Sequence, residues 1–171
     1  MGWIAAGLLV EGTLDDYELA LLPGAPQPTG ESASGSEVFS SEFGGDYAVA
    51  TVGEWTVLAD PDMRAAYDLS SPLFTEGRRV LVFVAHGVAS TYAIDWYVDG
   101  VSVRSIIDAE GERAVDDGDP IPEEAGFAVL DEDAVFALMH RLTGITFGQV
   151  TDATYRPLGN TQPIADDEQL D

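Results

Sequence analysis

The chain contains no cysteine and no lysine, and only seven arginines balance its acidic residues. The absence of cysteine excludes disulfides, thiolate metal sites and cysteine nucleophiles. The 31 aspartates and glutamates leave a formal net charge of −24 on 18.2 kDa. Such a charge repels nucleic acid and anionic membranes and attracts cationic partners. We therefore expect no direct nucleic-acid binding and no membrane binding.

Long hydrophobic runs are also missing. The apolar start from Trp3 to Val10 is too short to span a bilayer, and it runs into Glu11 without a cationic lead. We expect neither a signal peptide nor a transmembrane helix there, and interpret the run as a first buried strand. Together with the absence of cysteine, this favours a cytoplasmic protein.

The sequence has few elements of catalytic machinery. It lacks a Walker loop, a dinucleotide-binding glycine fingerprint and a His-Glu-x-x-His helix. The stretch GESASG at 30–35 does not match the G-x-S-x-G pattern of a nucleophile elbow. His86 is expected to end a strand and His140 to offset the dipole of a helix. We predict no catalytic residue, no metal ligand and no cofactor.

The composition predicts one folded domain. With 171 residues, 46% of them hydrophobic, the chain can bury a core of its own. We place this domain at residues 1–160, with a mobile surface loop rich in Pro, Gly and Ser at 23–36. An acidic C-terminal tail is expected at 161–171.

Apolar and alternating runs predict a sheet. Short strands are expected at 47–52, 55–59, 79–85, 92–98 and 101–107. Gly53-Glu54 and Asp99-Gly100 are expected hairpin turns. The alternation within 92–98 indicates that one face of this strand packs and the other meets water. Residues 62–69 are expected to form one or two helical turns.

Two helices are expected. Near the end of the chain, Asp131 is a candidate N-cap and Gly144 a candidate C-terminal stop. The apolar stripe between them consists of Val135, Leu138, Met139 and Leu142. A shorter helix is expected from a cap at Thr13 to Leu22, with Leu14, Tyr17 and Leu21 as its apolar stripe. A short terminal element is expected at 147–155.

These elements predict an α+β fold class. We expect an antiparallel, twisted sheet of about five to seven strands, with one long C-terminal helix and a short N-terminal helix packed on it.

Local crowding of acids is the strongest functional signal. Spread evenly over ~8,000 Å² of surface, the net charge would place neighbouring units roughly 18 Å apart, beyond a screening length of about 8 Å. The 26 residues of 108–133 instead hold eleven acids, with Arg113 as the only cation. This is more repulsion than a fold requires.

We therefore expect a non-enzymatic protein-binding module. Its segment 108–124 would present carboxylates to a basic partner such as a toxin, a nuclease or a nucleic-acid-binding protein. The module would act as an immunity-type inhibitor or as a mimic of nucleic acid, with Tyr97 as an exposed aromatic anchor. The candidate partner-binding residues are Asp108, Glu110, Glu112, Asp116, Asp117, Asp119, Glu123, Glu124 and Tyr97.

Two alternatives stay open. The turn Asp116-Asp117-Gly118-Asp119 could gather oxygens around Ca²⁺ or Mg²⁺ in a metal-dependent enzyme or ligand-binding protein. It does not match an EF-hand, because Arg113 stands where a loop counted from Asp108 needs glycine. Alternatively, this is a housekeeping domain whose acidity reflects a salt-accumulating or GC-rich host, as the absence of lysine and the single asparagine, Asn160, suggest.

Overall fold

The computed structural model describes residues 4–40, 43, 47–61, 63 and 77–160. Within these ranges, every paired strand runs antiparallel to its neighbours. The helical turns expected at 62–69, apart from Met63, and the acidic tail expected at 161–171 lie outside the described residues.

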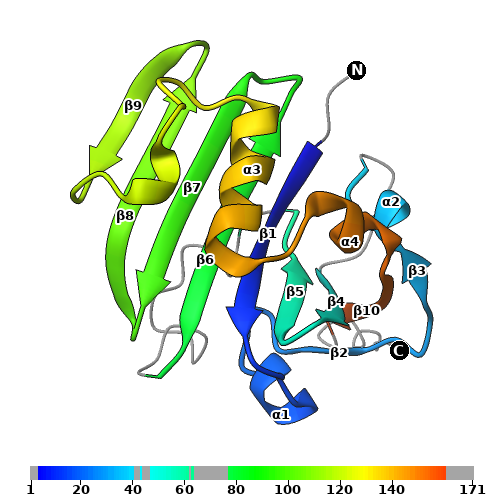
Figure 1. Cartoon of the computed structure of the whole chain (residues 1–171). Coiled ribbons are helices and arrows are strands. Elements are labelled where there is room, and N and C mark those ends of the chain that lie inside the picture. Colours follow the sequence, from blue (N-terminus) through cyan, green and yellow to red (C-terminus); the bar gives the residue numbers. More distant parts are fainter. Residues whose placement is uncertain (1–3, 41–42, 44–46, 62, 64–76, 161–171) are drawn as a thin grey trace.

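The described residues form one ten-stranded sheet, in the order β2-β10-β4-β5-β1-β6-β7-β8-β9, with β3 paired to β10 (Figure 1). The strands are β1 (Ile4–Glu11), β2 (Pro26–Pro28), β3 (Ala33–Ser34), β4 (Tyr47–Val52), β5 (Trp55–Ala59), β6 (Arg79–His86), β7 (Thr91–Val98), β8 (Val101–Ala109), β9 (Glu112–Asp117) and β10 (Thr154–Asn160). The helices are α1 (Asp16–Leu19), α2 (Gly35–Val38), α3 (Glu132–Thr143), α4 (Phe147–Asp152) and the 3-10 helix η1 (Pro122–Glu124).

The expected α+β class is wrong. The described chain is mainly antiparallel sheet, has ten strands where five to seven were expected, and has only one helix longer than six residues. That helix, α3, has the expected ends, because the Asp131 carboxylate accepts from the N–H of Ala134 at 2.8 Å and Gly144 is left-handed. At 12 residues, with α4 and β10 after it, α3 is not a long C-terminal helix.

Both faces of the central sheet are covered. On the first face, α3 lies over β6 and β7 (Figure 1), and its apolar side chains join those of the sheet in the larger core. On the second face, residues between β1 and β2 cover a smaller core. The second core includes Leu14, Leu19, Val80, Val82 and Tyr97. Because Asp95 and Tyr97 are also buried, the expectation that one face of 92–98 meets water is wrong.

Several local signals are confirmed, and others are not. Gly53-Glu54 joins β4 to β5, and Asp99-Gly100 joins β7 to β8 with both residues at positive φ. The segment 23–36, expected to be a mobile loop, contains β2 and β3, which pair with β10. The N-cap of α1 is Asp15 instead of Thr13, and Tyr17 is 74% exposed instead of packed. Among the described residues, no helix is long and apolar enough to span a bilayer.

Candidate protein-binding surface

The acidic segment forms the β8–β9 hairpin at one end of the sheet (Figure 1). Glu110 and Gly111 make its two-residue turn with φ angles of 53° and 82°, as the twist of a tight hairpin requires. The register pairs Ala109 with Glu112 at the turn and Ser105 with Asp117 at the far end, with an irregularity between them. Residues 108, 109 and 112–117 of the acidic segment 108–124 therefore lie in strands.

A buried arginine stabilises this hairpin through hydrogen bonds to several of its neighbours. Arg104 lies on β8 with its side chain only 2% exposed. Its Nε and Nη2 donate to the two carboxylate oxygens of Glu124 at 2.6 and 2.9 Å, and its Nη1 donates to Asp116 at 2.5 Å. Nη1 also donates to the backbone carbonyls of Asp117 and Gly118 at 3.2 and 3.0 Å. One side chain thus fixes the end of β9 and the following η1.

A second ion pair lies on the same face. Asp108, 1% exposed, accepts from Nε and Nη2 of Arg113 and from the backbone N–H of Leu130 at 2.6 Å. Arg113 also donates to the carbonyl of Ala128 at 3.2 Å. The segment between β9 and α3 is therefore tied to the first face of the sheet at several points.

These contacts set the ionisation of the acids involved. The hydrogen bonds from Arg104 hold the pKa values of Asp116 and Glu124 below their usual ranges, and the same bonds raise the pKa of Arg104. The hydrogen bond to Asp108 likewise raises the pKa of Arg113. Asp116 and Glu124 therefore stay ionised at neutral pH, opposite a cation inside the fold.

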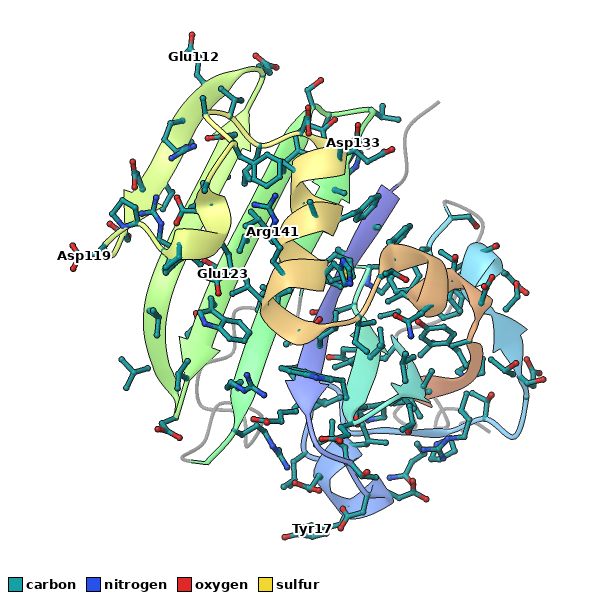
Figure 2. The ribbon with its side chains drawn as sticks, in the orientation of Figure 1. Tyr17, Glu112, Asp119, Glu123, Asp133 and Arg141 are labelled. Carbon is teal, nitrogen blue, oxygen red and sulfur yellow. The ribbon has the colours of Figure 1, made fainter. Side chains whose placement is uncertain are left out.

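The ion pairs divide the eight candidate acids into two groups. Asp108, Asp116 and Glu124 are paired with arginines, and of these three only Asp116 has an exposed side chain, at 54%. The exposed acids that make no ion pair within the described chain, called here the outer acids, are Glu110, Glu112, Asp117 and Asp119, while Glu123 is half-buried on η1. Figure 2 shows Glu112 and Asp119 directed away from the ribbon near the two ends of β9. The expectation that the whole cluster is surplus repulsion is therefore wrong, because part of it is internal neutralisation.

Tyr97 does not lie on this surface. It is 9% exposed, pairs across the sheet with Val80 and belongs to the second core. The expectation of an exposed anchor at this position is wrong, because the second face of β7 is covered. The exposed aromatic of the described chain is Tyr17 on α1, which points away from the ribbon in Figure 2.

A buried acid lies behind one of the outer acids. The register places Asp95 of β7 opposite Ser105 of β8, and Ser105 opposite Asp117 of β9, so the three share the second face. Burial raises the pKa of Asp95, and the charge of Asp117 raises it further, against the effect of a hydrogen bond with Ser105.

Sequence reasoning missed the role of Arg104. The signal was present, because Arg104 is the only charged residue in the otherwise apolar or small run of 101–107. A charged side chain in a buried strand needs an opposite charge at hydrogen-bonding distance. The acids that follow within 20 residues were the available partners, so part of the cluster could have been assigned to the fold.

The metal alternative finds no geometric support in the described ranges. Asp116, the first carboxylate of the expected 116–119 metal turn, is ion-paired with Arg104 and Arg113. Among the residues that the structure describes, no group of three or more His, Asp or Glu side chains is arranged to hold a metal ion.

Comparisons of the chain with models of protein families, with curated proteins and with solved structures give no match.

Proposed function

We propose that this chain is a non-enzymatic, acidic binding module of the immunity type, which neutralises a basic protein in the cytoplasm. The observation that carries the proposal is the separation of its acids. Arg104 and Arg113 are paired with carboxylates of the same chain, whereas the outer acids make no ion pair within the described chain. The outer acids are thus negative charges that the described fold does not use.

The hairpin presents these charges on a fixed backbone. The contacts of Arg104 to Glu124, Asp116 and two backbone carbonyls order the region before any partner arrives. A preordered surface loses less conformational entropy on binding. Arginine and lysine side chains of a partner would meet carboxylates whose backbone positions are already set.

The charge also favours one class of partner. A surface that binds phosphate groups is rich in arginine and lysine, and a row of carboxylates complements it. The net charge of −24 would accelerate encounter with such a surface and repel acidic competitors. A nuclease, a nucleic-acid-directed toxin or another nucleic-acid-binding protein is therefore the proposed partner class.

The test compares two variants with equal loss of charge. The site variant carries Glu112→Gln, Asp117→Asn and Asp119→Asn, and leaves Asp116 intact because Arg104 depends on it. The control variant carries Glu31→Gln, Glu54→Gln and Asp152→Asn, three exposed acids elsewhere. The wild-type chain is used to capture its partner from the native host lysate, and the purified partner is then titrated against all three proteins at low and physiological salt.

The proposal expects one basic partner, bound at least about tenfold more weakly by the site variant than by the control, with a smaller salt dependence. Equal affinity for the two variants would remove the outer acids from the interface. Capture of no partner, or of an acidic one, would overturn the proposal as a whole.

A further inference from the structure

We infer that the basic partner binds as an extended segment that adds a strand to the open edge of β9. The inference rests on the proposed function and specifies how the partner engages the same hairpin. It starts from the sheet topology, in which β9 is a terminal strand and pairs with β8 alone.

The outer edge of β9 is available for pairing. A terminal strand uses half of its backbone N–H and C=O groups for its one neighbour and leaves the rest unpaired. Within the described chain, residues 112–117 make no backbone–backbone hydrogen bond beyond β8. All of them except Val115 are exposed. Figure 1 shows β9 at the outer margin of the sheet, with η1 lying over the first face.

The other end of the sheet is closed to the same kind of binding. Its terminal strand β2 has three residues, and Pro26 and Pro28 have no N–H group to donate. Proline is one of the devices by which proteins block an edge. A third strand with a single neighbour, β3, has only two residues. Of the terminal strands in the described sheet, β9 is therefore the one that can accept a further strand.

The side chains of β9 specify the sequence that would fit. Glu112, Val115 and Asp117 lie opposite Ala109, Ile107 and Ser105 of β8, so the three share the second face. On the first face, Arg113 and Asp116 are already engaged in ion pairs. An added strand would therefore place basic side chains beside Glu112 and Asp117 and a β-branched side chain beside Val115, with neutral residues between them.

The same charges exclude a second copy of this chain. Two β9 strands paired edge to edge would bring carboxylates of Glu112, Asp117 and their neighbours together, and like charges across a strand pair are destabilising. A basic segment would instead place opposite charges across the strand pair, which is stabilising. The charges of the β9 edge therefore favour a basic partner strand and disfavour self-association.

The experiment uses a peptide with the sequence that the edge specifies, acetyl-Thr-Arg-Thr-Val-Thr-Arg-Thr-amide, and the ¹⁵N-labelled full chain. In an extended strand, alternate N–H groups point to opposite edges, so only one alternating set can face β9. Two further peptides carry N-methyl groups, one at the Arg and Val positions and one at the Thr positions. A fourth peptide replaces both arginines by glutamate.

Strand addition predicts chemical-shift changes centred on the amides of 112–117. One N-methylated peptide is expected to bind at least tenfold more weakly than the parent, while the other retains its affinity, and the glutamate peptide is not expected to bind. A variant with Glu112→Lys and Asp117→Lys is expected to prefer the glutamate peptide.

Other outcomes would overturn the inference. Equal binding of both N-methylated peptides would show recognition by charge alone, and would leave the proposed function intact. No binding of the parent peptide, or concentration-dependent self-association through 112–117, would exclude a basic strand as the occupant of this edge. The proposed function fails separately, when the captured partner does not distinguish the site variant from its control.

Discussion

Arg104 of β8 and Glu124 of η1 form a two-point ion pair that joins the sheet to the segment between β9 and α3. Two nitrogens of the guanidinium donate to the two oxygens of the carboxylate at 2.6 and 2.9 Å, and the side chains are 2% and 15% exposed. Glu124 also accepts from the backbone N–H of Ile121 at 2.9 Å. Since the pair is withdrawn from water, each partner depends on the other for its charge compensation.

Replacing Glu124 by glutamine is therefore expected to destabilise the fold. Glu124→Gln leaves Arg104 buried with only Asp116 as a charged partner, and removing one member of a buried pair costs about 3 kcal/mol in the free energy of unfolding. The neighbouring Glu123→Gln removes an equal charge from a half-buried side chain outside the network, and is expected to change that free energy by less than about 0.5 kcal/mol. Urea unfolding measures the free energy of unfolding of the two variants. Equal losses of stability would contradict the role assigned to Glu124 as the partner of Arg104.

Acidic pH is expected to destabilise the fold through the Arg104–Glu124 pair. The hydrogen bond from Arg104 lowers the pKa of Glu124 in the folded state, so the folded state binds this proton less readily than the unfolded state. The resulting stabilisation is complete above the unfolded pKa of about 4.3 and is lost as the pH falls through the lower, folded pKa. When unfolding is measured from pH 7 downward, the free energy of unfolding should fall more steeply for wild type and Glu123→Gln than for Glu124→Gln.

Asp95 is expected to have the opposite pH dependence. Burial raises its folded pKa, so its ionised form destabilises the fold above that pKa, and the penalty disappears as the pH falls to the unfolded value of about 3.9. Asp95→Asn removes the charge and keeps a polar group beside Ser105. The variant should gain stability relative to wild type at pH 7 and lose that advantage near pH 4. If Asp95→Asn differs from wild type by the same free energy of unfolding at both pH values, ionisation of Asp95 does not contribute to the difference.

Glycine is expected to be required at position 118 for two reasons, the left-handed backbone conformation and the lack of room for a Cβ atom. Its φ is +86°, and a Cβ at this position would lie 2.3 Å from the carbonyl oxygen of Val103. Gly111 has a similar φ of +82° with nothing within 4 Å of the same position. Gly111→Ala should cost about 1–2 kcal/mol for its left-handed backbone. Gly118→Ala should cost at least about 1 kcal/mol more, because backbone must shift. Similar losses for the two variants, in thermal or urea unfolding, would argue against the close contact.

The chain is expected to unfold cooperatively in dilute buffer without added salt. Each of the six arginines in the described ranges has an acidic or carbonyl partner, so part of the acidity is compensated locally. A housekeeping domain adapted to high salt would instead unfold when screening is removed, below about 0.5 M. Circular dichroism melts across a salt series separate the two expectations.

The sequence predicted those elements whose signals are local. The Asp99-Gly100 turn and the ends of α3 at Asp131 and Gly144 were found because each depends on the conformation or hydrogen bonds of a few adjacent residues. The apolar strands near the centre of the sheet were also found, since burial on both faces demands hydrophobic runs.

The strand β9 could not be found in the same way. Four of its six residues are charged, and aspartate and glutamate have low strand propensity. The pairing is set by β8 and by Arg104, which lie outside the segment itself. The proline-rich β2 was missed for a related reason, because proline is tolerated only at the edge of a sheet, and the edge is a property of the assembled fold. The burial of Tyr97 likewise depends on a second core that no single strand reveals.

The division between the acids paired with arginines and the outer acids has a consequence for how such a surface can evolve. Asp108, Asp116 and Glu124 are fixed by the arginines that they compensate, so substitutions there carry a penalty in folding. The outer acids compensate no arginine within the described chain, so we expect substitutions there to carry a smaller penalty. A lineage could therefore exchange one partner for another by drifting at these outer positions alone, while the scaffold that displays them stays under separate, purifying selection.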